Sequence, residues 1–120
     1  PCEQACGVKA IGSDSQFRSH DALMTLKLWD DVRRGEEKYI FPFQEEADII
    51  FNTTLVYEFA VLKKYAEPLL QGVPETEAVY TNAQRLLGLL SHVTPLDKEL
   101  IPKNSILREF VGGSAFKEAL

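Results

Sequence analysis

Two adjacent arginines, Arg33 and Arg34, have the side chains best suited to bind an anion in this chain. Gly35 and Lys38 follow, so three cations lie within six residues. A guanidinium group can bind two phosphate oxygens at once, and this cluster could therefore form a phosphate clamp. The alternative is that both arginines lie in the last turn of a helix and complement its dipole. Spacing alone favours the alternative.

Other groups capable of chemistry lack the partners that a site needs. Residues 36–37 and 45–48 are rich in carboxylates, but most such runs are solvated faces and not acid–base pairs or magnesium sites. His20 and His92 have no serine or cysteine close in sequence that they could activate. Trp29 lies in a predicted helix, where a tryptophan packs more often than it stacks on a ligand. None of these residues is predicted to be catalytic.

Composition limits the possible partners. The chain has 120 residues, enough for one domain, with 45% hydrophobic and 26% charged residues. No apolar run approaches the roughly 20 residues that a membrane span needs. The net charge of −5 argues against nucleic acid, because nonspecific binding to phosphates requires clustered Lys and Arg. We therefore expect neither a membrane nor a nucleic-acid partner.

The cysteines and the N-terminal residues indicate the compartment. Cys2 and Cys6 are the only two cysteines, and a structural zinc site needs about four ligands. We therefore predict no metal site and two incidental thiols in a reducing environment. Residues 1–15 lack the basic-then-apolar order of a signal peptide and form a loose leader or a tag-derived segment. A cytoplasmic location is expected.

The elements that must position the arginines are a helix and a strand. Ser19 can cap a helix that runs to Arg34, just before Gly35. Residues 48–52 form a short apolar run between polar residues, which is typical of a strand covered on both faces in a parallel sheet. Since a lone strand leaves its backbone unpaired, it should pair with residues 39–43 or, as we prefer, with a second copy of the chain.

The C-terminal part is predicted to be helical. Thr53 and Thr54 can cap a helix that Pro68 interrupts near Ala66. A second amphipathic helix is predicted over residues 75–93, with Pro95 beyond its end. A short last helix is capped by Asn104 or Ser105 and closed by Gly112 and Gly113.

Several of these segments together carry a resemblance. They read VRRGEEKYIFPFQEEAD at 32–48, FN at 51–52, YEFAVLK at 57–63, YAEPLL at 65–70 and IPKNSILREFVGGS at 101–114. In this combination the chain resembles the C-terminal third of bacterial nucleoside kinases of the uridine kinase/phosphoribulokinase family. The resemblance covers residues 16–116 and leaves 117–120 as a tail.

The resemblance implies an ATP-dependent transfer of a phosphoryl group to a nucleoside, with magnesium. In such kinases a mobile lid precedes the last core strand and carries arginines that neutralise the transferring phosphoryl group. Arg18, Arg33 and Arg34 fall in that part of the pattern and become the phosphate-binding candidates. Ser19 stands where the family usually has a glycine after the first of these arginines.

The phosphate-binding loop of that family is missing from this chain. No G-x-x-x-x-G-K-[ST] pattern occurs, and Gly112 and Gly113 follow a predicted helix when a phosphate loop would precede one. The predicted fold is therefore an α/β fragment, mainly helical, comprising the lid helix, last core strand and C-terminal helices of a P-loop kinase. Alone it should hold neither ATP nor magnesium and be inactive. Its expected partner is the missing N-terminal core or a second copy of the chain.

A different class of function stays open. The chain could be a stand-alone regulatory or oligomerisation module derived from such a kinase. That hypothesis needs the leucine stripe Leu86, Leu87 and Leu90 to contact a partner, whereas a lid needs Arg33 and Arg34 to contact phosphate.

Overall fold

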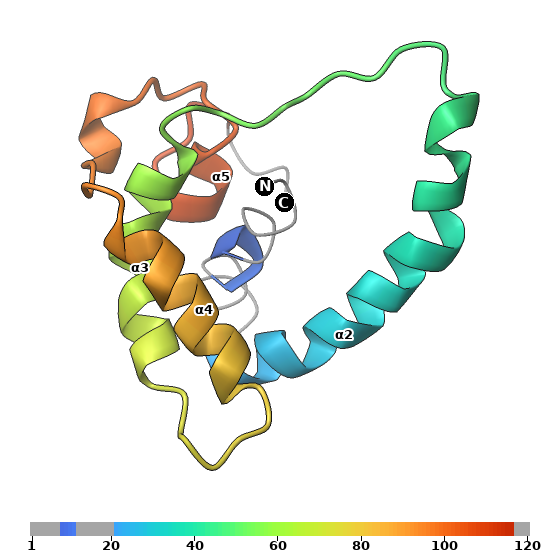
Figure 1. Ribbon diagram of the computed structural model, residues 1–120. Helices are drawn as coiled ribbons and strands as arrows, with labels where there is room; N and C mark the ends of the chain where they lie inside the picture. Colours follow the sequence, from blue (N-terminus) through green and yellow to red (C-terminus); the bar gives the residue numbers. More distant parts are fainter. Residues whose placement is uncertain (1–7, 12–20, 117–120) are drawn as a thin grey trace.

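The computed structural model describes residues 8–11 and 21–116, and in that part of the chain every regular element is helical. The order is a single helical turn at 8–11, then α2 (Ala22–Tyr39), the 3₁₀ helix η1 (Phe41–Glu46), α3 (Glu58–Gln71), α4 (Tyr80–Ser91), the 3₁₀ helix η2 (Lys98–Leu100) and α5 (Arg108–Val111) (Figure 1). The mainly helical architecture predicted from the sequence is confirmed.

The core forms where α3 packs against α4, which runs antiparallel to it (Figure 1). Its largest members are completely buried and come from four segments of the chain: Ile11, Leu62, Leu70, Leu90 and Leu107. The segment after α4 is fixed to α3 by backbone and side-chain bonds. The Leu96 amide donates to the Ala60 carbonyl at 2.9 Å, and Lys63 Nζ donates to the Val93 carbonyl at 3.0 Å.

Two buried charged side chains join the ends of the described chain to this core. Glu58 is fully buried at the start of α3, where it forms an ion pair with Lys9. The Lys9 ammonium also lies 5.9 Å from the centre of the Phe110 ring. Arg108 is buried as well, and it donates to the Ile101 carbonyl at 3.0 Å. These contacts hold the 8–11 turn and α5 against α3.

Helix α2 projects from the core as an arm, and its far end lies well away from α3 and α4 (Figure 1). The Asp21 carboxylate caps its first turn by accepting from the Met24 amide at 2.8 Å. The predicted cap, Ser19, lies outside the described residues. The prediction that the helix stops at Arg34 is wrong, because Gly35 is tolerated within it and the helix continues to Tyr39.

The predicted strand at residues 48–52 is absent. Residues 47–55 have no regular structure and cross from the arm back to α3 as an extended connection (Figure 1). The proposed pairing partner, residues 39–43, instead forms the end of α2 and the start of η1, with Pro42 in the first turn of η1. Without a neighbour to receive its backbone hydrogen bonds, an apolar segment gains nothing from adopting strand geometry.

Three helix boundaries also differ from prediction. Pro68 lies inside α3, which continues to Gln71 because burial of Leu70 outweighs the one backbone bond that proline removes. Thr53 and Thr54 lie before the start of α3 and do not cap it. Helix α4 begins at Tyr80, since the residues from Pro74 onward form hydrogen-bonded turns.

The predicted end of the last helix at Gly112 is confirmed, but the predicted cap at Asn104 or Ser105 is wrong, because α5 (Arg108–Val111) has Leu107 as its N-cap and no side-chain cap. Ser105 Oγ accepts from the Leu107 amide at 3.4 Å just before α5. Gly112 ends α5 with a φ of 81°, and Gly113 follows with 78°, a region that favours glycine. None of the helices in the described part of the chain is long and apolar enough to cross a membrane.

Candidate functional site

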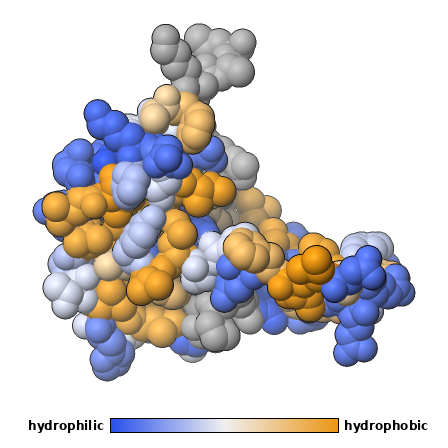
Figure 2. All heavy atoms as spheres, turned by 90° about the horizontal axis from the view of Figure 1, so that it is seen from above, coloured by the Kyte–Doolittle hydropathy of each residue, from blue (hydrophilic) through white to orange (hydrophobic). Residues whose placement is uncertain are grey.

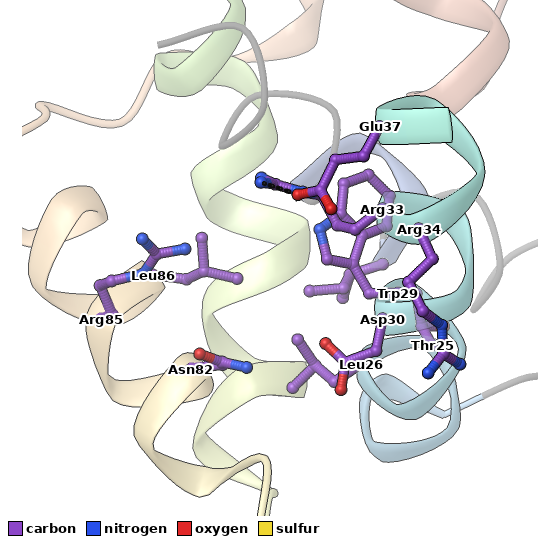
Figure 3. Close-up of a pocket in the computed structure, with 11 residues that line it drawn as sticks. Thr25, Leu26, Trp29, Asp30, Arg33, Arg34, Glu37, Asn82, Arg85 and Leu86 are labelled. Atoms are coloured by element: carbon purple, nitrogen blue, oxygen red, sulfur yellow. Dashed lines mark hydrogen bonds and ion pairs between the residues drawn. The ribbon is translucent and has the colours of Figure 1, made fainter. Parts of the chain in front are cut away.

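A cavity of about 430 Å³ lies between the arm helix α2 and helix α4. Its walls are mixed, with three arginines, two carboxylates, one amide and several apolar side chains (Figure 3). The residues lining it are Ile11, Thr25, Leu26, Trp29, Asp30, Arg33, Arg34, Glu37, Asn82, Arg85 and Leu86. We refer to it as the α2–α4 cavity.

Arg33 and Arg34, predicted from the sequence, both line this cavity. Arg33 is the more enclosed, with its side chain 28% exposed, and its guanidinium lies 3.3 Å from the Glu37 carboxylate one turn later. Arg34 is 73% exposed and forms an ion pair with Asp31. Arg18, the third candidate, lies outside the described residues.

The alternative interpretation of these arginines as helix-end charges does not fit their position. They stand in the interior of α2, and Lys38 is the only basic residue of its last turn. The partial negative charge of a helix end is felt mainly within its last turn. Each arginine instead has a carboxylate partner three or four residues away on the same helix, an arrangement that stabilises exposed helices by a few tenths of a kcal/mol.

The opposite wall contributes Arg85 and Asn82, which the sequence analysis missed. Both are exposed residues of α4. Among the described residues Arg85 has no hydrogen-bond or ion-pair partner. The signal in the sequence was the spacing of three between Asn82 and Arg85, which places them on one face of the helix. That spacing does not reveal that the face lies opposite Arg33.

The charges of the described residues that line the α2–α4 cavity sum to a small positive value, because there are three guanidinium groups and the two carboxylates of Asp30 and Glu37. In Figure 3, Asp30 points from α2 toward the amide of Asn82 on α4, while Glu37 and Arg33 meet near the top of the gap. Trp29 lies on the α2 wall between them. The arrangement can bind an anion that also carries hydrogen-bond donors and a flat apolar part.

The described residues form no cluster of metal ligands. Within residues 8–11 and 21–116, no group of three or more His, Cys, Asp or Glu side chains comes together to hold a metal ion. Among the described residues, the pKa of Tyr80 departs clearly from its ordinary value. Desolvation raises the pKa of Tyr80, and the Glu75 carboxylate, which accepts its hydroxyl at 3.3 Å, raises it further. Tyr80 does not line the cavity.

The leucine stripe of α4 faces inward. Leu86 and Leu90 are buried in the chain's own core, and Leu87 packs partly against it. Leu86 and Leu90 are therefore not exposed for contact with a partner, whereas Leu87 is half-buried.

No protein-family model matches the chain, and neither a curated protein nor a solved structure is similar to it.

Proposed function

We propose that this chain is the C-terminal part of a cytoplasmic, ATP-dependent kinase that phosphorylates a uridine-like nucleoside, and that it is inactive alone. It supplies the lid and substrate-side structure, while a missing N-terminal core holds ATP and magnesium. The single observation that carries the proposal is the exposed apolar segment Ile49, Ile50 and Phe51, whose exposures are 84%, 78% and 82%.

A soluble protein gains from covering such a segment. Burying a large apolar side chain contributes about 1.5–3 kcal/mol, and contiguous exposed apolar patches mark surfaces that bind another protein or domain. The pattern of residues 48–52 is that of a strand covered on both faces, and its backbone lies in an extended connection. A kinase core with an open sheet edge would supply both the backbone partners and the apolar cover.

The two arginines support the lid role. They lie on the projecting helix α2, and the segment that we expect to join the sheet follows that helix directly in the chain. Phosphoryl transfer is accelerated mainly by positioning and by cations placed around the transferred group. Arg34 is largely exposed and reaches its carboxylate partner only at the surface, so a phosphate can compete for it.

One observation also favours the second candidate, a regulatory or oligomerisation module. The same apolar segment could pair with a second copy of this chain, since two extended segments can satisfy each other's backbone. The two hypotheses differ in the reading frame: a kinase requires an upstream phosphate-binding loop, and a stand-alone module does not. They differ also in the expected mass of the isolated chain in solution, because the module hypothesis predicts a stable dimer in sedimentation.

The kinase proposal is tested with a coupled phosphorylation assay using uridine, ATP and magnesium. We expect no turnover by the chain alone and turnover by the protein that also carries the core. Replacing both arginines in that protein (Arg33→Ala with Arg34→Ala) should lower kcat by about a hundredfold, since each would contribute about 1.4 kcal/mol, or a factor of ten, to the transition state.

A matched control removes two positive charges elsewhere. Lys64 and Lys103 are exposed and lie outside the cavity, so replacing both with alanine should leave kcat unchanged. Turnover by the isolated chain, or equal kcat for the two double variants, would contradict the proposal.

A further inference from the structure

The α2–α4 cavity has the size of a small-molecule site. Ligand pockets commonly enclose about 300–1,000 Å³ and combine apolar walls with a few convergent polar groups. This cavity, at about 430 Å³, has Ile11, Leu26 and Leu86 as its apolar lining. All three of these side chains are buried, so the apolar lining is part of the core.

Two opposite charges stand on opposite walls of the cavity without neutralising each other. Asp30 belongs to α2 and Arg85 to α4, and among the described residues neither forms an ion pair or a hydrogen bond. Figure 3 shows Arg85 on the α4 wall and Asp30 across the gap on the α2 wall. A ligand that fills the gap can satisfy both, provided that it carries an anionic end and separate hydroxyl donors.

The remaining lining specifies the rest of such a ligand. Trp29 offers an aromatic face on which a flat ring can stack, and base–aromatic stacking contributes to binding whatever the base. Asn82 has both a donor and an acceptor in its side-chain amide, which suits the edge of a base or a sugar hydroxyl. An inorganic anion would use Arg85 and leave Trp29, Asp30 and Asn82 without a role.

We infer that the α2–α4 cavity binds a nucleoside monophosphate, with the Arg85 guanidinium on the phosphate, the Asp30 carboxylate on the sugar hydroxyls and the Trp29 indole against the base. The described α4 lining has the Arg85 guanidinium and no carboxylate, so the phosphate would lie at that wall and accept from Arg85 through two parallel hydrogen bonds. Binding takes place on this chain alone. The inference deepens the proposed function, on which it rests for its choice of nucleotide, because a nucleoside monophosphate is the product that the proposed kinase would release.

The test uses the whole chain and uridine monophosphate as the probe. Trp29 is the only tryptophan, so its fluorescence reports on this cavity and on nothing else, and calorimetry measures the affinity independently. We expect saturable binding by both methods. Arg85→Ala should weaken binding by about tenfold or more, because a charge-assisted pair of hydrogen bonds is lost. The control Lys103→Ala removes the same charge from an exposed residue outside the cavity and should bind as the unmodified chain does.

Two further ligands distinguish what the phosphate, the ring and the sugar each contribute to binding. Inorganic phosphate should bind more weakly and leave the Trp29 fluorescence unchanged. Phenyl phosphate has a ring and a phosphate but no sugar, so Asp30→Asn should weaken uridine monophosphate and leave phenyl phosphate unaffected. Circular dichroism of each variant checks that the helices are intact.

Three results would overturn the inference: no saturable binding of uridine monophosphate, equal affinity for Arg85→Ala and Lys103→Ala, or equal affinity for inorganic phosphate and the nucleotide. The outcome is separable from that of the kinase proposal. Nucleotide binding is measured on the isolated chain at Arg85 and Asp30, whereas turnover is measured with the core present at Arg33 and Arg34.

Discussion

The α3–α4 core buries its apolar side chains, whereas the α2 arm leaves several of its own exposed. Leu62, Leu70 and Leu90 are completely buried between α3, α4 and the segments that cover them. The arm exposes Met24, Leu28 and Val32 along one face, at a spacing of four. Figure 2 shows apolar and charged side chains mixed on the part of the molecule that projects to the right, which contains the far end of the arm.

The two regions differ in how completely the rest of the chain covers their apolar side chains. The core has its own cover, since the segment between α4 and α5, and α5 itself, pack against it. The arm and the connection at residues 47–55 expose apolar side chains that the rest of the chain does not reach. Exposed apolar patches are typical of surfaces that bind another protein or domain, which is the role proposed above for this segment.

The largest expected effect comes from shortening one side chain in each region. Leu70→Ala should lower the free energy of unfolding by about 2–5 kcal/mol, because it opens a cavity in the core. Ile50→Ala removes a comparable side chain from an exposed position and should change the stability of the isolated chain by less than about 0.5 kcal/mol. Urea denaturation followed by circular dichroism measures both. Similar losses would mean that residue 50 is buried in solution and that the two regions do not differ.

A smaller change in the free energy of unfolding is expected from replacing one glycine in each of two helices. Gly35 in α2 and Gly88 in α4 have open space where a methyl group would stand, so alanine meets no obstacle at either position. Alanine is favoured over glycine inside a helix by about 1 kcal/mol. Gly88→Ala should therefore stabilise the chain by about 0.5–1 kcal/mol.

Gly35→Ala should raise the same unfolding free energy by less, because the far end of α2 makes few contacts with the cooperative core. Thermal and urea denaturation of the two variants give the comparison directly. Equal stabilisation would show that arm and core unfold as one unit.

The sequence predicted the elements whose signal is local. The stripe containing Leu86 and Leu90 indicated α4. Gly112 indicated the end of α5, and the structure shows it there with a positive φ. Helical periodicity and glycine conformation depend on residues a few positions apart, so they can be read from the chain alone.

Features that depend on distant residues were predicted less well. The strand at residues 48–52 requires a neighbouring strand, and none is present in the described part of the chain. Pro68 remained within α3 because Leu70 is buried by packing that its own sequence does not show. Arg33 and Arg34 were found from their type and spacing, but Arg85 became a candidate only when folding placed α4 opposite α2.

Our central proposal is that residues 48–51 join a sheet that the described part of the chain does not contain, and amide hydrogen exchange tests this proposal most directly. Exchange is measured on the chain alone and on the protein translated from the complete reading frame. In the chain alone these amides should exchange at nearly the rate of an unstructured peptide, while those of Leu62 and Leu90 are protected. In the longer protein the amides of residues 48–51 should exchange at least about a hundredfold more slowly, equivalent to about 2.7 kcal/mol of added local stability. Unchanged exchange at residues 48–51 in the longer protein would contradict the account.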